Sequence, residues 1–352
     1  MPMLSRTKRI SYYDTLKALL IALVVFGHTL GVFPFTSALR ATYLLIYSFH
    51  MPLFIFVCGI FAKWKAKKSL SCLLVFLIFS ALQILFKVFV VSPSQGYTFL
   101  DILKLFVYPR WGAWFLLAYA AYILSVWFIR KVTLWDILAA FTLSLVIGFA
   151  PFVNVCLSLS RIFYFFPFFL LGRWCGQNRN RFHNFIRNAQ SGKLAPLFLS
   201  LAGLMLFATF LSLALYKGDI PISLFYGKYS YSKDFLDLCF GGRIICFSLA
   251  LLNGISILIL ILIPMQPNNH SFSTNSFLAQ GRNTLGASTF SIYLFHILFL
   301  MVFKYYYVPS TIPIGADLAF AILLTILLLG ATSIPPLRKG ANFLLNGFSK
   351  AH

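Results

Sequence analysis

The sequence contains no glutamate, and its acidic residues are seven aspartates against 29 lysines and arginines. Charged residues of both signs make up only 10% of the 352 residues, whereas a soluble globular domain carries about 25%. This shortage of charge excludes an ordinary soluble domain. Together with a hydrophobic content of 60%, it predicts an integral membrane protein. Any carboxylate chemistry must come from Asp14, Asp101, Asp136, Asp219, Asp234, Asp237 and Asp317.

Cysteine is also scarce, and the six cysteines form no CxxC pair. Most of them lie within apolar runs, where a cysteine behaves as a small buried hydrophobe, so we expect neither a metal site nor disulfides. The formal charge of +22 is spread over the loops. That distribution is typical of one side of a membrane protein rather than of a nucleic-acid surface, and we expect no nucleic-acid partner.

Long apolar runs dominate the chain. A transmembrane helix needs about 20 apolar residues. Ten segments qualify, so the sequence predicts an all-α bundle of about ten transmembrane helices in a single domain over residues 1–352. The segments are 15–34, 41–62, 70–91, 111–130, 133–153, 157–175, 195–216, 243–264, 285–307 and 314–335.

The first run follows basic residues, as in a signal peptide, but it is long and lacks a small-residue cleavage site, so we interpret it as a retained span. The longest predicted loops are 176–194, 217–242 and 265–284. The segment 97–106 has an apolar face and two charges, which is typical of a helix lying flat at the interface.

Lysine and arginine are distributed unequally between alternate loops. One set of loops, together with both termini, holds 18 of these residues, and the other set holds seven. Because basic loops remain on the cytoplasmic side, we predict that both termini are cytoplasmic.

Four titratable or basic residues fall inside predicted spans: His28, His50, Arg161 and His296. Such residues are costly in a bilayer and are by default candidates for a functional site. The alternative for each single histidine is a neutral ring that hydrogen-bonds between helices. Because all four lie near the middle of their spans or slightly outward of it, they could meet near the bilayer midplane.

Lys17 and His28 lie at the two ends of the apolar stretch "LKALLIALVVFGH". Eleven helical residues turn through about 1100° and rise about 16 Å, so the two side chains share one face without touching. Asp14 is three residues before Lys17 and can form a helical ion pair with it. Alternatively, Asp14 and Lys17 are only an interfacial anchor. Asp14 is too distant to orient His28, which leaves another aspartate, a backbone carbonyl, a hydroxyl or a second histidine.

Five segments, in chain order, resemble the acyltransferase-3 family of membrane acyltransferases. They are "YYDTLKALLIALVVFGH" (12–28), "SFHMPLFIFVCGIFAK" (48–63), "WGAWFLLAYAAY" (111–122), "RIFYFFPFFLLGRWCG" (161–176) and "LGASTFSIYLFHILFL" (285–300). Within that family the sequence is most similar to the sugar O-acetylase branch that lacks a fused esterase-like domain. Lys17 departs from the family pattern, in which arginine is common; lysine keeps the charge but loses the bidentate fork.

The resemblance implies transfer of an acyl group from an acyl-coenzyme A to a glycan hydroxyl in the bacterial cytoplasmic membrane. Acetyl-CoA would be the donor, and the acceptor would be a cell-surface glycan or its lipid-linked precursor. The expected donor-binding residues are Lys17 and Asp14, because they lie at the cytoplasmic mouth. The expected catalytic residues are His28, Arg161 and His50, and the further candidates are Trp114, Tyr293 and His296.

Two mechanisms remain open for His28. It could act as a general base on the acceptor hydroxyl, or it could be acylated first and pass the acyl group outward. Two other functions are compatible with many spans and buried charge. A glycan exporter or flippase would need no acyl-CoA, but we detect no repeat halves of the kind that many transporters show. A glycan polymerase is the third possibility, although the outer loops contain few arginines.

Overall fold

In the computed structural model, the described residues are 11–33, 35–91, 93–94, 96–109, 111–150, 153, 156–216, 220–228, 230–231, 236–264, 281, 284–306 and 316–350. Helices dominate this part of the chain, and no strand occurs within it. The predicted all-α membrane bundle is therefore confirmed for the described residues.

The first half of the chain forms six α-helices. They are α1 (Ser11–Leu30), α2 (Ser37–Ile60), α3 (Ala66–Phe86) continued by the π-helical turn η1 (Lys87–Val91), α4 (Phe99–Val107), α5 (Ala113–Phe128) and α6 (Leu134–Val146). Two short 3₁₀ turns, η2 (Ile147–Phe149) and η3 (Cys156–Ser158), lead from α6 towards the second half.

The second half continues the bundle. Its elements are α7 (Leu159–Gln177), α8 (Arg179–Ser191), α9 (Ala195–Leu215), the turn η4 (Ile222–Tyr226), α10 (Leu236–Leu262), α12 (Thr289–Tyr306), α13 (Ala316–Thr332) and α14 (Pro335–Lys350).

Seven of the described helices are long and apolar enough to cross a membrane. The pair α13 and α14 qualifies as an eighth span only when taken together, and it is bent by 67°. Each of the ten predicted segments contains a helix. Besides α13, two of these helices are too short to cross a membrane on their own: α5, with 16 residues, and α6, with 13 residues followed by η2. The figure of ten spans therefore stays a prediction.

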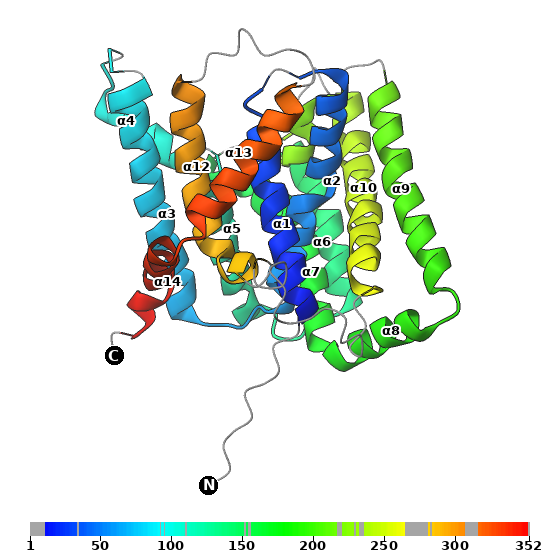
Figure 1. The fold of residues 1–352 in the computed structure, drawn as a ribbon. Coiled ribbons are helices and arrows are strands. Elements are labelled where there is room, and N and C mark those ends of the chain that lie inside the picture. The colour runs from blue at the N-terminus through cyan, green and yellow to red at the C-terminus, as the bar shows by residue number, and fades with distance from the viewer. Residues whose placement is uncertain are drawn as a thin grey trace.

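The segment predicted as the loop 176–194 contains the helix α8. This helix crosses the end of the bundle where α1 begins (Figure 1). Its sequence, "RNRFHNFIRNAQS", is too polar for a span, but its few apolar residues recur on one face, and Ile186 is buried. The prediction was wrong because it relied on mean hydropathy, which does not detect a short amphipathic helix.

Helices α1 and α2 lie at the centre of the bundle, and α9 lies at its edge (Figure 1). In the apolar windows, 61% of α1 and 72% of α2 are buried within the protein, against 11% of α9. The central helices are those that carry Lys17, His28 and His50.

Helix α14 lies at the end of the bundle where α1 begins (Figure 1). The turn between α2 and α3, the turn between α5 and α6, and the helix α8 all lie at that end. We call it the basic end and the other the opposite end. The described lysines and arginines at the basic end include Lys63, Lys65, Arg130, Lys131, Arg179, Arg181, Arg187, Arg338 and Lys339. If the predicted cytoplasmic termini are correct, this end would be the cytoplasmic one.

Helices α2 and α7 cross with almost no space between their backbones. A Cβ atom on Gly172 would overlap the carbonyl oxygen of Phe56, and one on Gly59 would overlap the carbonyl oxygen of Phe169. Small residues permit this close approach in membrane bundles. The crossing fixes the register of α2, which carries His50, against α7, which carries Arg161.

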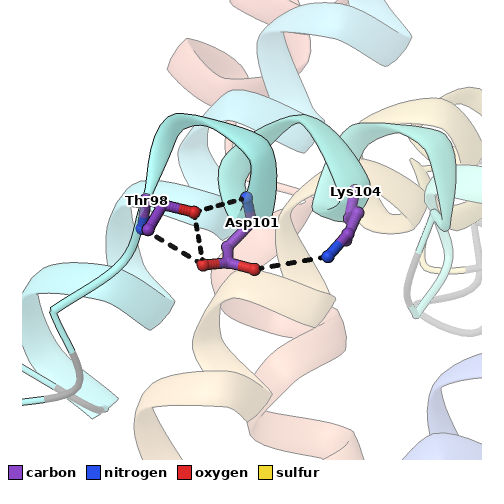
Figure 2. Close-up of polar contacts among 3 residues, drawn as sticks. All are labelled: Thr98, Asp101 and Lys104. Carbon is purple, nitrogen blue, oxygen red and sulfur yellow. Dashed lines mark hydrogen bonds and ion pairs between the residues drawn. The ribbon is translucent and has the colours of Figure 1, made fainter.

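The short helix α4, which follows α3 in the chain, lies at the opposite end and at the edge of the bundle, beside the end of α3 (Figure 1). Figure 2 shows its capping box: the backbone amide of Asp101 donates to Thr98 Oγ1, and the backbone amide of Thr98 donates to the Asp101 carboxylate. Lys104 Nζ lies 3.6 Å from the same carboxylate. The Thr98 hydroxyl also donates to this carboxylate, at 2.6 Å. The bonds from the Thr98 hydroxyl and amide lower the pKa of Asp101, so the cap remains intact at neutral pH.

Candidate active site

A cavity of about 700 Å³ lies inside the opposite half of the bundle, and we call it the central cavity. His28 of α1, His50 of α2, Trp114 of α5 and Arg161 of α7 all line it. Four residues that the sequence singled out on separate spans therefore meet around one space. Further lining residues come from segments at the opposite end, so the cavity faces that end; they are Tyr108, Pro109, Trp111, Lys228 and Lys304.

His28 faces the central cavity, and a second histidine lies behind it. The ring of His296, on α12, has its centroid 5.4 Å from that of His28. His296 is fully buried, and its Nδ1 lies 2.7 Å from the carbonyl oxygen of Ile292. Because a carbonyl only accepts, Nδ1 carries the hydrogen and the neutral ring leaves a lone pair on Nε2. That Nε2 is buried and has no hydrogen-bond partner among the described residues.

His50 has one nitrogen occupied in the same way. Its Nδ1 lies 2.8 Å from the carbonyl oxygen of Ile46, one helical turn earlier. The ring is almost completely buried and packs against the Tyr47 ring, with 4.6 Å between the two centroids. It still lines the central cavity. His50 thus makes the local backbone contact that the alternative interpretation expects, and it also faces the candidate site.

Arg161 is held from two sides. Its guanidinium lies 4.9 Å from the centroid of the Trp114 ring, in a cation–π arrangement, and its Nε donates to the carbonyl oxygen of Tyr226 at 3.3 Å. Trp114 itself is buried and stacks on Phe165. A fixed cation therefore stands at the wall of the cavity that His28 also lines.

Three tyrosines form an aromatic wall of the central cavity: Tyr43 and Tyr47 of α2, and Tyr226 of η4. Tyr43 and Tyr47 stack with centroids 4.1 Å apart, and the hydroxyls of Tyr43 and Tyr226 are 2.7 Å apart. Sequence reasoning did not identify these residues, because tyrosines are abundant in the chain. The i, i+4 spacing of Tyr43 and Tyr47 was the available signal.

Tyr293 does not line the central cavity. Its hydroxyl donates to the carbonyl oxygen of Gly112, immediately before α5, and its ring packs edge-on against Phe115. Tyr293 is also 6.3 Å from His296, measured between ring centroids. Its position links the beginning of α5 to α12, next to the histidine pair.

Lys17 and Asp14 lie towards the basic end of α1, away from the central cavity. Lys17 Nζ is 3.5 Å from the Asp14 carboxylate, which agrees with the predicted i, i+3 pair. The same ammonium stands 4.9 Å from the centre of the Phe61 ring. The Lys17 side chain keeps 31% of its surface exposed, whereas Asp14 is buried.

Helix α8 brings further basic residues close to this end of α1. The ring of His183 lies 6.4 Å from that of Tyr13, and Tyr13 packs edge-on against Phe61. Partial burial and the neighbouring Arg179 and Arg187 lower the pKa of His183. Sequence reasoning missed this group because it interpreted residues 176–194 as a loop.

Arg243 is a buried cation that the sequence did not single out, although it is the first residue of a predicted span. Its Nη1 donates to the carbonyl oxygen of Ser144 at 2.7 Å, and its guanidinium lies 4.7 Å from the Tyr231 ring. Arg243 therefore joins α10 to α6. It does not line the central cavity, so we assign it a structural role.

The geometry agrees with a comparison of the sequence with family models. A model described as an acyltransferase domain matches residues 10–335. The chain belongs to the acyltransferase-3 family. The match spans every helix that contributes to the central cavity, and it makes this acyltransferase-3 protein a multi-pass membrane acyltransferase.

No curated protein and no solved structure matches this acyltransferase-3 chain. Within the described part of the chain, no three histidine, cysteine or acidic side chains are grouped as they would be to hold a metal ion. The side chains that line the cavity include imidazoles, a guanidinium, two ammonium groups and aromatic hydroxyls.

Proposed function

We propose that this membrane acyltransferase moves an acetyl group from acetyl-CoA to a hydroxyl of a cell-surface glycan or its lipid-linked precursor. It would act in the bacterial cytoplasmic membrane, with both termini in the cytoplasm. The observation that carries this proposal is the meeting of His28 and Arg161, from two distant helices, at one cavity large enough for a sugar. The family match supports the reaction class, and the geometry supports the roles of these residues.

In the proposed reaction His28 is the general base. Its neutral imidazole takes the proton of the acceptor hydroxyl while the hydroxyl oxygen attacks the thioester carbonyl carbon. The carbon–sulfur bond then breaks, and the departing thiolate takes that proton from His28. The products are a glycan ester and free CoA, and His28 returns to its starting state.

Arg161 is suited to stabilise the oxyanion that forms on the thioester oxygen. Fixed charges directed at developing charge are most effective when they need no reorganisation. Both partners of Arg161, the Trp114 ring and the Tyr226 carbonyl, restrict how far the guanidinium can move.

His296 is suited to orient His28. The sequence left four types of group for this role, and the second histidine lies beside the His28 ring, closer than the ring of Tyr47 at 6.4 Å between centroids. The lone pair on His296 Nε2 can accept an N–H of His28, which would direct the other His28 nitrogen towards the acceptor. A small rotation of His28 would be sufficient, because the ring centroids are 5.4 Å apart. His50 lines the same cavity and is a second candidate to contact the acceptor.

The acceptor sugar would lie against Tyr43, Tyr47 and Tyr226. Aromatic rings bind the apolar faces of sugars, and their hydroxyls can bond the sugar hydroxyls. The cavity faces the opposite end of the bundle, so a glycan would enter from the outer side of the membrane.

The donor would bind from the basic end. Lys17 has a partly exposed ammonium there, and α8 contributes Arg179 and His183 nearby. CoA phosphates are anionic, so these groups are suited to attract the nucleotide end. The distance of about 16 Å from Lys17 to His28 along α1 would then be bridged by the extended arm that carries the thioester.

The proposal is tested with membranes that contain the wild type or His28→Ala, supplied with acetyl-CoA labelled in the acetyl group. We expect label in the glycan or glycolipid fraction with the wild type and none with His28→Ala. Absence of transfer and of CoA binding by the wild type would overturn the proposal in favour of an exporter. Trapping an acetylated His28 without acceptor, by rapid quench, would replace the general-base mechanism with the acyl-histidine relay.

A further inference from the structure

A second hollow adjoins the central cavity, and we call it the lateral groove. It has a volume of about 370 Å³ and lies between α3 with η1, α4 and α12. Apolar side chains supply most of its wall, among them Ile84, Phe86, Leu105 and Met301. The mechanism proposed above does not use this groove.

The lateral groove and the central cavity share two wall residues, Trp111 and Lys304. Lys304 Nζ stands 5.6 Å from the centre of the Trp111 ring. Trp111 adopts a φ of 50°, in the left-handed region that is unfavourable for a residue with a side chain. Strained backbone of this kind clusters at functional sites. A ligand at this junction can therefore extend into both spaces.

Positive charge is confined to one end of the groove. Lys87 and Lys304 line it, and both lie at the opposite end of the bundle, on η1 and near the end of α12. Each makes a cation–π contact, Lys87 with Tyr97 at 5.4 Å, but neither forms an ion pair with a described carboxylate. Ser80, also in the wall, lies about 10 Å further into the bundle along α3.

Polarity along the groove thus runs from two ammonium groups at the outer end to an apolar interior. This is the polarity of a membrane lipid whose anionic head lies at the surface and whose chain points inward. An ordinary bilayer lipid could fill the groove, but it carries no group that would extend into the central cavity. A lipid whose phosphate bears a sugar would occupy both the groove and the central cavity.

We propose that the lateral groove binds the aliphatic chain of a lipid phosphate that carries the glycan acceptor, with the phosphate between Lys87 and Lys304. The attached sugar then lies in the central cavity, beside the tyrosines and His28. This inference rests on the proposed function, and it selects the lipid-linked precursor as the acceptor over a free glycan.

The test uses the full chain in nanodiscs of neutral lipid and a diazirine-bearing farnesyl phosphate as the photoaffinity probe. We expect peptides containing Leu105 and Met301 to be labelled. The double variant Lys87→Gln, Lys304→Gln should lose about tenfold of that labelling, because each ammonium makes a charge-assisted contact with the phosphate. Leu105→Trp should reduce it without any change in charge, by filling the groove.

Lys104→Gln is the matched control, since Lys104 is on α4 at the same end but pairs with Asp101 and does not line the groove. It should label like the wild type. Farnesol tests the need for phosphate, and a diazirine-bearing phosphatidylglycerol tests an ordinary anionic lipid. Equal labelling by phosphatidylglycerol, labelling independent of both lysines, or no labelling of these peptides would overturn the proposal.

Acetyl transfer is measured on the same samples to separate the two proposals. Labelling of the groove without any acetyl transfer would leave the lipid site standing and remove the proposed function. Acetyl transfer accompanied by groove labelling that is equal in the wild type and the double lysine variant would keep the enzyme and discard the lipid site. Size-exclusion profiles of every variant identify any that fail to fold.

Discussion

The ring centroids of His28 and His296 lie 5.4 Å apart although the two residues come from α1 and α12, which are far apart in the sequence. One ring faces the central cavity. The other is fully buried, with Nδ1 bonded to its own helix and Nε2 without a partner in the described structure. In the proposed mechanism, this pair offers one imidazole to the substrate and a second to orient the first.

His28→Ala should lower the turnover number by about 10²- to 10⁴-fold, the usual contribution of a general base. Binding of acetyl-CoA should change little, because the nucleotide end is expected near Lys17. Steady-state kinetics with separate titration of donor and acceptor measures both effects. A variant that retains more than a tenth of wild-type turnover would remove His28 from the mechanism.

His296→Gln should retain much more activity than His296→Ala. A glutamine amide can donate to the Ile292 carbonyl and also present an oxygen acceptor towards His28, whereas alanine can do neither. The loss in His296→Ala should fall on the turnover number and leave the KM values nearly constant, which a simple packing defect would not produce. Equal activity of the two variants would show that the lone pair of His296 is not used.

Arg161→Lys should lower turnover by roughly 10²-fold, in the range found when one oxyanion donor is lost. Lysine keeps the positive charge but loses the planar group that stacks on Trp114 and bonds the Tyr226 carbonyl. Trp114→Phe retains a ring and should cost less than Trp114→Ala. If Arg161→Lys is fully active, charge alone is sufficient and the fixed geometry is unimportant.

Lys17→Ala should weaken acetyl-CoA binding by about 10- to 100-fold, equivalent to the 1.5–3 kcal/mol of one charged hydrogen bond. Lys17→Arg should restore or exceed the wild-type affinity because of its bidentate fork. Binding is measured by titrating a non-hydrolysable acetyl-CoA analogue. Unchanged affinity in Lys17→Ala would mean that Lys17 and Asp14 are only an interfacial anchor.

Gly172→Ala should destabilise the fold by about 1–3 kcal/mol, as overpacking does, because the new methyl group meets the Phe56 carbonyl. Separation of α2 and α7 would also disturb His50 and Arg161, so activity should fall with stability. Gly203→Ala on α9 is the control, since a Cβ there meets nothing within 4 Å. Thermal unfolding in detergent measures both variants, and equal midpoints would contradict the tight crossing.

The sequence alone determined the class of fold. Lack of charge and long apolar runs require helices in a bilayer, where every backbone group must be bonded within its own segment. Spacing within one helix could also be predicted from the helical period, and the Asp14–Lys17 pair agrees with it. The five ordered segments, from Asp14 to His296, identified the family before any geometry was known.

Only the tertiary structure decided which helices are neighbours. No period in the sequence brings α1 beside α12, and the contact of His28 with His296 arises from packing between distant segments. The tyrosine wall, the α8 group near Lys17 and the lateral groove depend on such packing too. These features are built from residue types that are common throughout the chain. The role of each residue therefore depends on its neighbours in space and not on its local sequence.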